Sequence, residues 1–135
     1  SLFRTYRCSP MTLFELQETV LKYINKQEKE IPFWNLITQP YSSLEDRCKN
    51  IAKSISFSTS IEKGESVIGG GTLPDVTLES PILLINNEKT VDTVNQLIKN
   101  DIPIIPRIIK DQVCLDLRSV FHNQDDIIVQ ALNNS

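Results

Sequence analysis

Apolar positions in the first third of the chain recur at the spacing of helices. Apolar side chains three and four residues apart predict a helix over 12–28, and the pair Thr12 and Glu15 at its start fits a capping box. A short helical turn is expected over 33–37, between two prolines. A second capping box then opens a helix over 42–54. Its predicted apolar face consists of Leu44, Cys48, Ile51 and Ile55.

From residue 55 the period of the pattern shortens to two. Apolar or threonine residues alternate with serines over 55–61, which predicts a strand, and the polar residues 62–65 predict a turn after it. The remaining elements are expected in this order: a short strand at 66–68, a strand at 81–86, a helix from Thr90, strands at 104–109 and 113–117 joined by a tight polar turn, and a helix from about Asn123 through Leu132.

This order of elements predicts an α+β fold. Strands joined by hairpins and helices grouped apart from them favour a mostly antiparallel sheet of about four to five strands, with helices on one face and two helices before it. The pattern further predicts a lead-in segment over 1–11 and one domain over 12–135. A length of 135 residues suits a single core.

Charge and cysteine content exclude several classes of protein. The net charge of -3 argues against a standalone nucleic-acid-binding protein, which usually carries a basic surface. The longest apolar run, 81–85, is too short to cross a bilayer, so no membrane association is expected. Three widely spaced cysteines and one histidine do not match a zinc site or a disulfide framework. Free thiols are typical of a reducing cytosol, so a cytoplasmic location is expected.

The glycines of the chain are concentrated in one place. Gly69, Gly70 and Gly71 are consecutive and are followed by Thr72, and such a run permits positive φ angles and close backbone approach. One interpretation is a loop whose amides meet an anion or a partner domain. The other, which the run by itself favours, is a bulge or a tight crossover. No lysine follows in the register of a nucleotide-binding P-loop.

Three arginines are candidates for binding anions. Arg4 and Arg7 are three residues apart, so on a helical turn they would present two guanidinium groups to a phosphate or carboxylate. The spacing by itself favours two solvated arginines. Arg107 lies in an apolar strand, where a charge must reach solvent, form a pair or face a cleft. Arg118 follows Asp116 at strand spacing, which predicts a side-chain pair.

Taken together, these segments resemble the C-terminal part of bacterial selenocysteine synthases. The resemblance rests on four ordered segments: Gly69-Gly70-Gly71-Thr72-Leu73-Pro74; Leu2 to Arg7 with Met11-Thr12-Leu13; Pro32-Phe33-Trp34 with Pro40; and Pro103 to Ile108 with Leu115 to Arg118. Together they extend over nearly the whole chain. The resemblance implies the small domain of a fold-type-I enzyme that uses pyridoxal phosphate, and 1–11 would lead in from the large domain.

The resemblance also implies a reaction and partners. Such an enzyme converts seryl-tRNA(Sec) to selenocysteinyl-tRNA(Sec) with selenophosphate, and it works as a homo-oligomer. Arg4 and Arg7 match an arginine pair implied to bind the anionic selenium donor, and Arg107 matches an arginine of the small domain. No lysine of the chain has the context of the lysine that holds the cofactor. We therefore expect no catalytic residue, no metal and no bound pyridoxal phosphate in this chain, which alone would be inactive.

Two alternatives remain open. The chain begins with serine rather than methionine, which favours a piece of a longer protein. That protein could be a relative of selenocysteine synthase that acts on a small amino acid or amino sugar. A different class altogether would be a standalone module whose glycine loop binds an anion or a peptide.

Overall fold

The computed structural model of the protein describes residues 6–68 and 76–134. The chain divides into two compact units, Ser1–Asn35 and Leu36–Ser135. The division into a lead-in segment over 1–11 and a domain over 12–135 stays a prediction.

The first unit is built around helix α2, Pro10–Ile24. The predicted cap at Thr12 is wrong: Ser9 is the N-cap, and its Oγ accepts a hydrogen bond from the backbone N–H of Thr12 at 3.1 Å. Proline fits the first helical position because it has no N–H to satisfy, so the helix begins two residues earlier than expected. It also ends earlier, because Lys26 adopts a left-handed φ of 58° that closes the C-terminus.

Two short helices follow, η1 at Glu28–Glu30 and α3 at Pro32–Ile37. The predicted helical turn over 33–37 is therefore confirmed. Trp34 donates its indole N–H to the hydroxyl of Tyr23 at 2.6 Å, and the rings of Phe33 and Trp34 meet edge to face. No residue of α2 is buried, so its apolar side chains do not form a core in the first unit.

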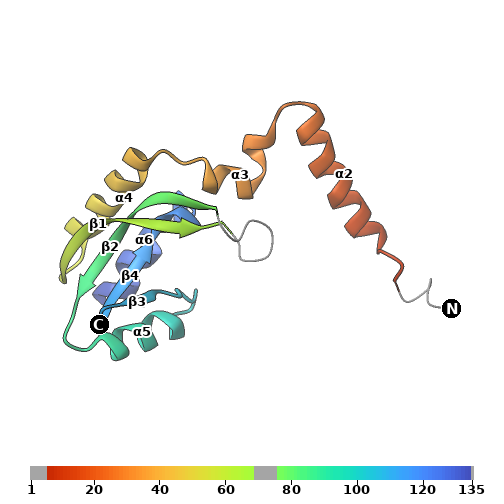
Figure 1. The fold of residues 1–135 in the computed structure, drawn as a ribbon. Coiled ribbons are helices and arrows are strands. Elements are labelled where there is room, and N and C mark those ends of the chain that lie inside the picture. The colour runs from red at the N-terminus through yellow and green to blue at the C-terminus, as the bar shows by residue number, and fades with distance from the viewer. Residues whose placement is uncertain (1–5, 69–75, 135) are drawn as a thin grey trace. The chain divides into compact units, whose positions relative to one another are not determined.

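The second unit contains an antiparallel sheet of four strands in the order β1-β2-β4-β3 (Figure 1). The strands are β1 Ser58–Val67, β2 Thr77–Asn86, β3 Arg107–Ile109 and β4 Gln112–Asp116. Three helices accompany them: α4 Tyr41–Ser54, α5 Thr90–Lys99 and α6 Asp125–Asn133. The predicted α+β class and antiparallel sheet are confirmed.

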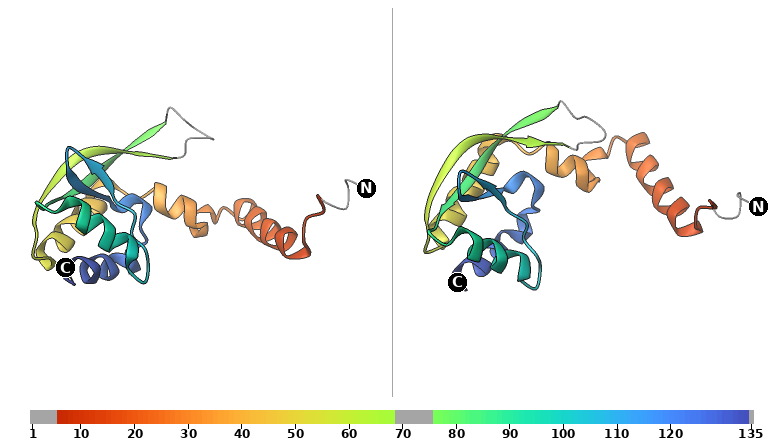
Figure 2. Two further views of the ribbon diagram at one scale, coloured as in Figure 1. Left: turned by 90° about the horizontal axis from the view of Figure 1, so that it is seen from below. Right: turned by 60° about the horizontal axis from the view of Figure 1, so that its bottom comes forward.

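The core lies between one face of this sheet and the helices. Its members from β2 and β4 include Leu83, Ile85 and Leu115, and the predicted apolar face of α4 packs against them. α5 and α6 complete the layer with the following side chains: Leu97, Ile128, Ala131 and Leu132. Figure 2 shows the helices gathered beside the sheet from two further directions.

The tight polar turn predicted at 110–112 is present, but Gln112 already belongs to β4, where it pairs with Ile109. Lys110 and Asp111 have φ angles of 51° and 61°, as the two central residues of a type I′ hairpin turn require. Strand β3 is shorter than the predicted 104–109. The chain leaves β4 at Leu117 and enters the 3-10 turn η2, Leu117–Ser119, which is followed by η3, His122–Gln124.

The turn predicted at 62–65 is wrong. Strand β1 runs straight through these residues and pairs with β2 from Ser58↔Asn86 to Val67↔Thr77. Gly64 is therefore a strand residue, and crowding explains it: a Cβ at this position would lie 2.5 Å from Cγ1 of Ile82. The glycine permits the close approach of β1 to a buried side chain of β2.

We expect Gly64→Ala to lower the free energy of unfolding by about 1–3 kcal/mol, the usual cost of overpacking a filled site. Alanine normally stabilises a strand relative to glycine, so the expected decrease in the free energy of unfolding comes from the clash with Ile82. Urea unfolding of the purified chain measures the effect, and Glu62→Ala, an exposed change on the same strand, is the matched control. An unchanged midpoint for Gly64→Ala would show that Ile82 moves aside at no cost.

The other face of the sheet also buries apolar side chains. Ile82, Leu84 and Cys114 lie on it and are only 5%, 5% and 1% exposed. Arg107, on edge strand β3, reaches the carbonyl of Glu65 on the opposite edge strand β1. In a flat sheet these strands would be about 14 Å apart, too far for one side chain. The sheet therefore curls, and Arg107 lies on its concave face.

Candidate functional site

One side chain from each of the four strands meets on the concave face. Asp116, at the end of β4, accepts hydrogen bonds from Ser66 Oγ of β1 at 2.5 Å and from Ser80 Oγ of β2 at 2.9 Å. Arg107 Nη2 of β3 lies 3.1 Å from the same carboxylate. We call these four residues the Asp116 cluster.

Solvent exposure increases across the Asp116 cluster from Ser80 to Arg107. Ser80 is fully buried, the Asp116 side chain is 14% exposed and the Arg107 side chain is 44% exposed. The backbone N–H of Arg118 also donates to Asp116, at 3.1 Å. These four hydrogen bonds occupy the acceptor positions of the Asp116 carboxylate. The part of the cluster that can meet a ligand is the guanidinium of Arg107, a donor suited to anions.

The sequence anticipated part of this arrangement. Arg107 forms a pair, which was one of the predicted outcomes, and its partner is Asp116. The predicted side-chain pair of Asp116 with Arg118 is wrong. The chain leaves the strand at Leu117, so the two side chains no longer share one face of the sheet.

Arg118 instead inserts its guanidinium among backbone carbonyls. It donates Nη1 to the carbonyls of Ile37 and Gln39 and Nη2 to the carbonyl of Glu79, over 2.6–3.0 Å. Arg118 is buried, and within the described residues its Nε has no hydrogen-bond partner. The residue therefore ties β2 to the segment ahead of α4.

A second buried arginine, Arg47 of α4, was missed by the sequence analysis. Its guanidinium makes a bidentate pair with Asp125 at 2.7 and 2.9 Å and also binds Gln39 Oε1 and the carbonyls of Leu117 and Val120. Its position in the sequence could have identified it as buried, because it lies three residues after Leu44 on the helix face that packs against the core. A charge at such a position requires partners within the fold.

The remaining predicted site residues belong to other parts of the chain. Arg4 and the loop residues Gly69 to Thr72 lie outside the described residues. Arg7 is exposed and precedes the Ser9 cap, so it is not part of helix α2. It belongs to the first unit, whereas Arg107 belongs to the second.

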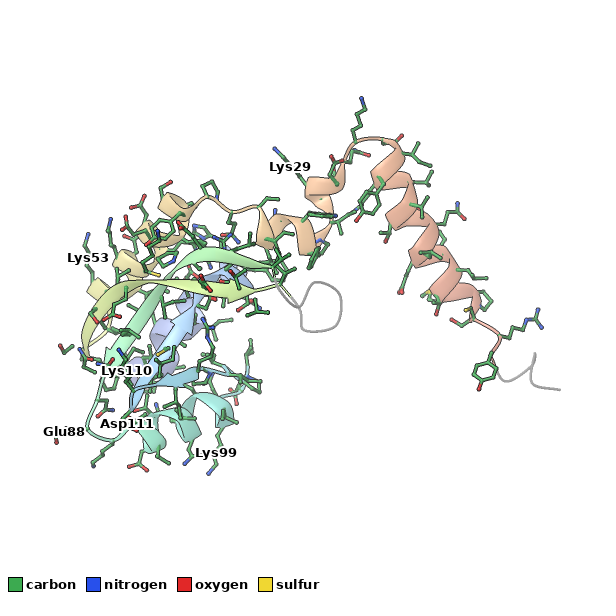
Figure 3. The ribbon with its side chains drawn as sticks, viewed as in Figure 1. Lys29, Lys53, Glu88, Lys99, Lys110 and Asp111 are labelled. Atoms are coloured by element: carbon green, nitrogen blue, oxygen red, sulfur yellow. The ribbon has the colours of Figure 1, made fainter. Side chains whose placement is uncertain are left out.

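The lysines of the chain do not fit a covalent site for pyridoxal phosphate. A lysine that bonds to this cofactor must react as a neutral amine, which burial or nearby positive charge favours. Every lysine of the chain lies in the described residues and none of them is buried. Figure 3 shows Lys53 and Lys99 pointing away from the sheet. Hydrogen bonds with Glu45 and Glu79 raise the pKa of Lys49 and Lys63, respectively, which is the wrong direction for a nucleophile.

The two buried thiols also lack the character of nucleophiles. Burial raises the pKa of Cys48 to about 12, and burial also raises the pKa of Cys114. Over residues 6–68 and 76–134 no group of three His, Cys, Asp or Glu side chains could hold a metal ion. No helix in this part of the chain has the length and apolar character needed to cross a membrane.

Comparison with known proteins gives a consistent result. A family model described as L-seryl-tRNA selenium transferase matches residues 1–121. An L-seryl-tRNA(Sec) selenium transferase of Clostridium perfringens is 32% identical over 97% of this chain. Enzymes of the same name from Clostridium botulinum and Campylobacter jejuni are 30% and 29% identical over 96% and 98% of it. The chain spans only about 30% of the length of these relatives.

Proposed function

The chain belongs to the L-seryl-tRNA selenium transferase family, and from this premise we propose that it is part of an enzyme that converts seryl-tRNA(Sec) to selenocysteinyl-tRNA(Sec). The observation that carries the proposal is the family match over residues 1–121, which includes every segment of the resemblance. The selenium donor would be selenophosphate. The intact enzyme would be a cytoplasmic homo-oligomer that contains pyridoxal phosphate.

In this proposal the chain binds and positions the selenium donor, and it does not hold the cofactor. The exposed lysines support that division, because none is desolvated as a covalent cofactor site would require. The covalent lysine would lie in the part of the enzyme that this chain does not include. That part would also supply the surface against which the apolar side chains of α2 pack.

Arg4 and Arg7 are the residues proposed to bind the selenium donor. Two guanidinium groups match the oxygens of a phosphate-like dianion through charge-assisted hydrogen bonds. The exposure of Arg7 supports this role, since its guanidinium is accessible to a ligand. Arg107 is a second candidate for binding an anionic group, and Asp116 would orient its side chain.

Complementation tests the proposal for the intact protein. The full-length gene that encodes this chain should restore selenoprotein formation in a bacterium that lacks its own selenium transferase. Incorporation of ⁷⁵Se into protein is the readout. The host must keep its own enzyme that forms selenophosphate. Absence of ⁷⁵Se incorporation from a soluble, cofactor-loaded protein would favour the alternative, a relative that acts on a small amino acid or amino sugar.

A further inference from the structure

The β1–β2 hairpin has two halves with different support. Strand β2 pairs with β4 only from Ile82↔Asp116 to Ile85↔Val113. Over the other half, from Lys63↔Pro81 to Val67↔Thr77, β1 and β2 pair only with each other. We call residues 63–67 and 77–81 the hairpin arm. Figure 2 shows the hairpin running on beyond the other two strands.

Apolar packing holds the base of the hairpin arm but little of the rest. Pro81, at the base, is fully buried, and the thiol of Cys48 on α4 donates to its carbonyl at 3.9 Å. Beyond Pro81, no residue of the arm belongs to either apolar cluster of the second unit. Several side chains of the arm are exposed: Lys63, Glu65, Val67, Thr77 and Glu79. Segments with few buried apolar contacts open more readily than the core of the same protein.

Beyond Pro81, polar contacts to three charged side chains hold the hairpin arm. Ser66 and Ser80 donate their hydroxyls to Asp116. Arg107 donates to the carbonyl of Glu65 at 3.3 Å, and Arg118 donates to that of Glu79 at 2.6 Å. All four are hydrogen bonds to charged groups, which are stronger than those between neutral groups.

From these contacts we propose that the hairpin arm is a strap that opens as a unit, with Asp116, Arg107 and Arg118 as its latch. In the closed state the latch fixes the Arg107 guanidinium between Asp116 and β1. Opening breaks the four hydrogen bonds to the arm and exposes the Arg107 guanidinium and the Asp116 carboxylate to solvent, while the core under α4, α5 and α6 stays packed. Because Arg118 also binds Ile37 and Gln39, the arm is coupled to the segment ahead of α4.

Amide hydrogen exchange followed by NMR on the purified chain tests this proposal. In Asp116→Asn the amide oxygen can still cap η2, but the charge that strengthens the hydrogen bonds from Ser66 and Ser80 is lost. Amides of the hairpin arm should then exchange about 10- to 100-fold faster, as expected for the loss of charged hydrogen bonds. Amides of residues 82–85 and of α4 should keep their rates. Arg107→Ala removes the more exposed partner of the ion pair with Asp116 and should give the same pattern of exchange rates.

Lys63→Gln is the matched control. It removes the ion pair of Lys63 with Glu79 at 2.8 Å, which joins the two strands of the arm to each other and not to the rest of the sheet. Exchange in the arm should be unchanged, because such an exposed pair contributes little. Equal acceleration of arm and core amides in both latch variants would show that the arm does not open separately. Unchanged arm rates in Arg107→Ala would show that no latch exists.

Discussion

Replacing Arg47 by alanine is expected to lower the free energy of unfolding by about 3–5 kcal/mol, the usual result of breaking a buried pair by removing one partner. The Arg47 side chain is 3% exposed and binds four residues: Gln39, Leu117, Val120 and Asp125. Without the guanidinium, Asp125 loses its charge partner and two carbonyls lose a donor. The expected loss is a large share of the stability of a domain of this size.

Chemical unfolding of the purified chain, followed by circular dichroism, measures this effect. Lys49→Ala is the matched control from the same helix, because Lys49 forms an exposed pair with Glu45 and should give no measurable shift. Arg47→Lys should fall between the two, since lysine keeps the charge but loses the planar fork. Wild-type stability for Arg47→Lys would contradict the view that the set of directed hydrogen bonds matters.

The second large effect concerns the proposed donor site in the intact enzyme. Arg4→Ala combined with Arg7→Ala should reduce selenium transfer at least about a hundredfold, because charge-assisted hydrogen bonds to the dianion are lost. The loss should appear mainly when selenophosphate is limiting. The visible absorbance of the bound cofactor should stay intact, since no lysine of this chain fits the cofactor. Single-turnover transfer to seryl-tRNA(Sec) is the measurement.

Two further variants make this result interpretable. Arg4→Lys with Arg7→Lys should recover part of the transfer, because the positive charges remain while the bidentate geometry is lost. Arg107→Ala separates the two candidate anion sites: if it alone abolishes transfer, the donor binds at the Asp116 cluster. Unchanged turnover in the double alanine variant would refute the assignment of the donor to Arg4 and Arg7.

Local patterns determined the elements of the fold. The helical spacing from Leu44 to Ile55 identified α4 and its buried face, and the tight polar turn predicted at 110–112 was recognised from its residues. These patterns depend only on residues close together in the sequence, so they can be recognised without knowledge of the fold. The ordered segments of the resemblance likewise identified the family, because they run in the same order along the chain.

The tertiary structure decided which polar residues meet. The sequence placed Gly64 in a turn, since only the packing of Ile82 shows why a strand needs glycine there. Nothing local indicates that Ser66, Ser80 and Arg107 converge on Asp116, because strand order and sheet curvature bring them together. The sequence thus determined the elements and the family. Contacts between residues distant in sequence determined the Asp116 cluster and the latch, since such contacts depend on how the strands pair and bend.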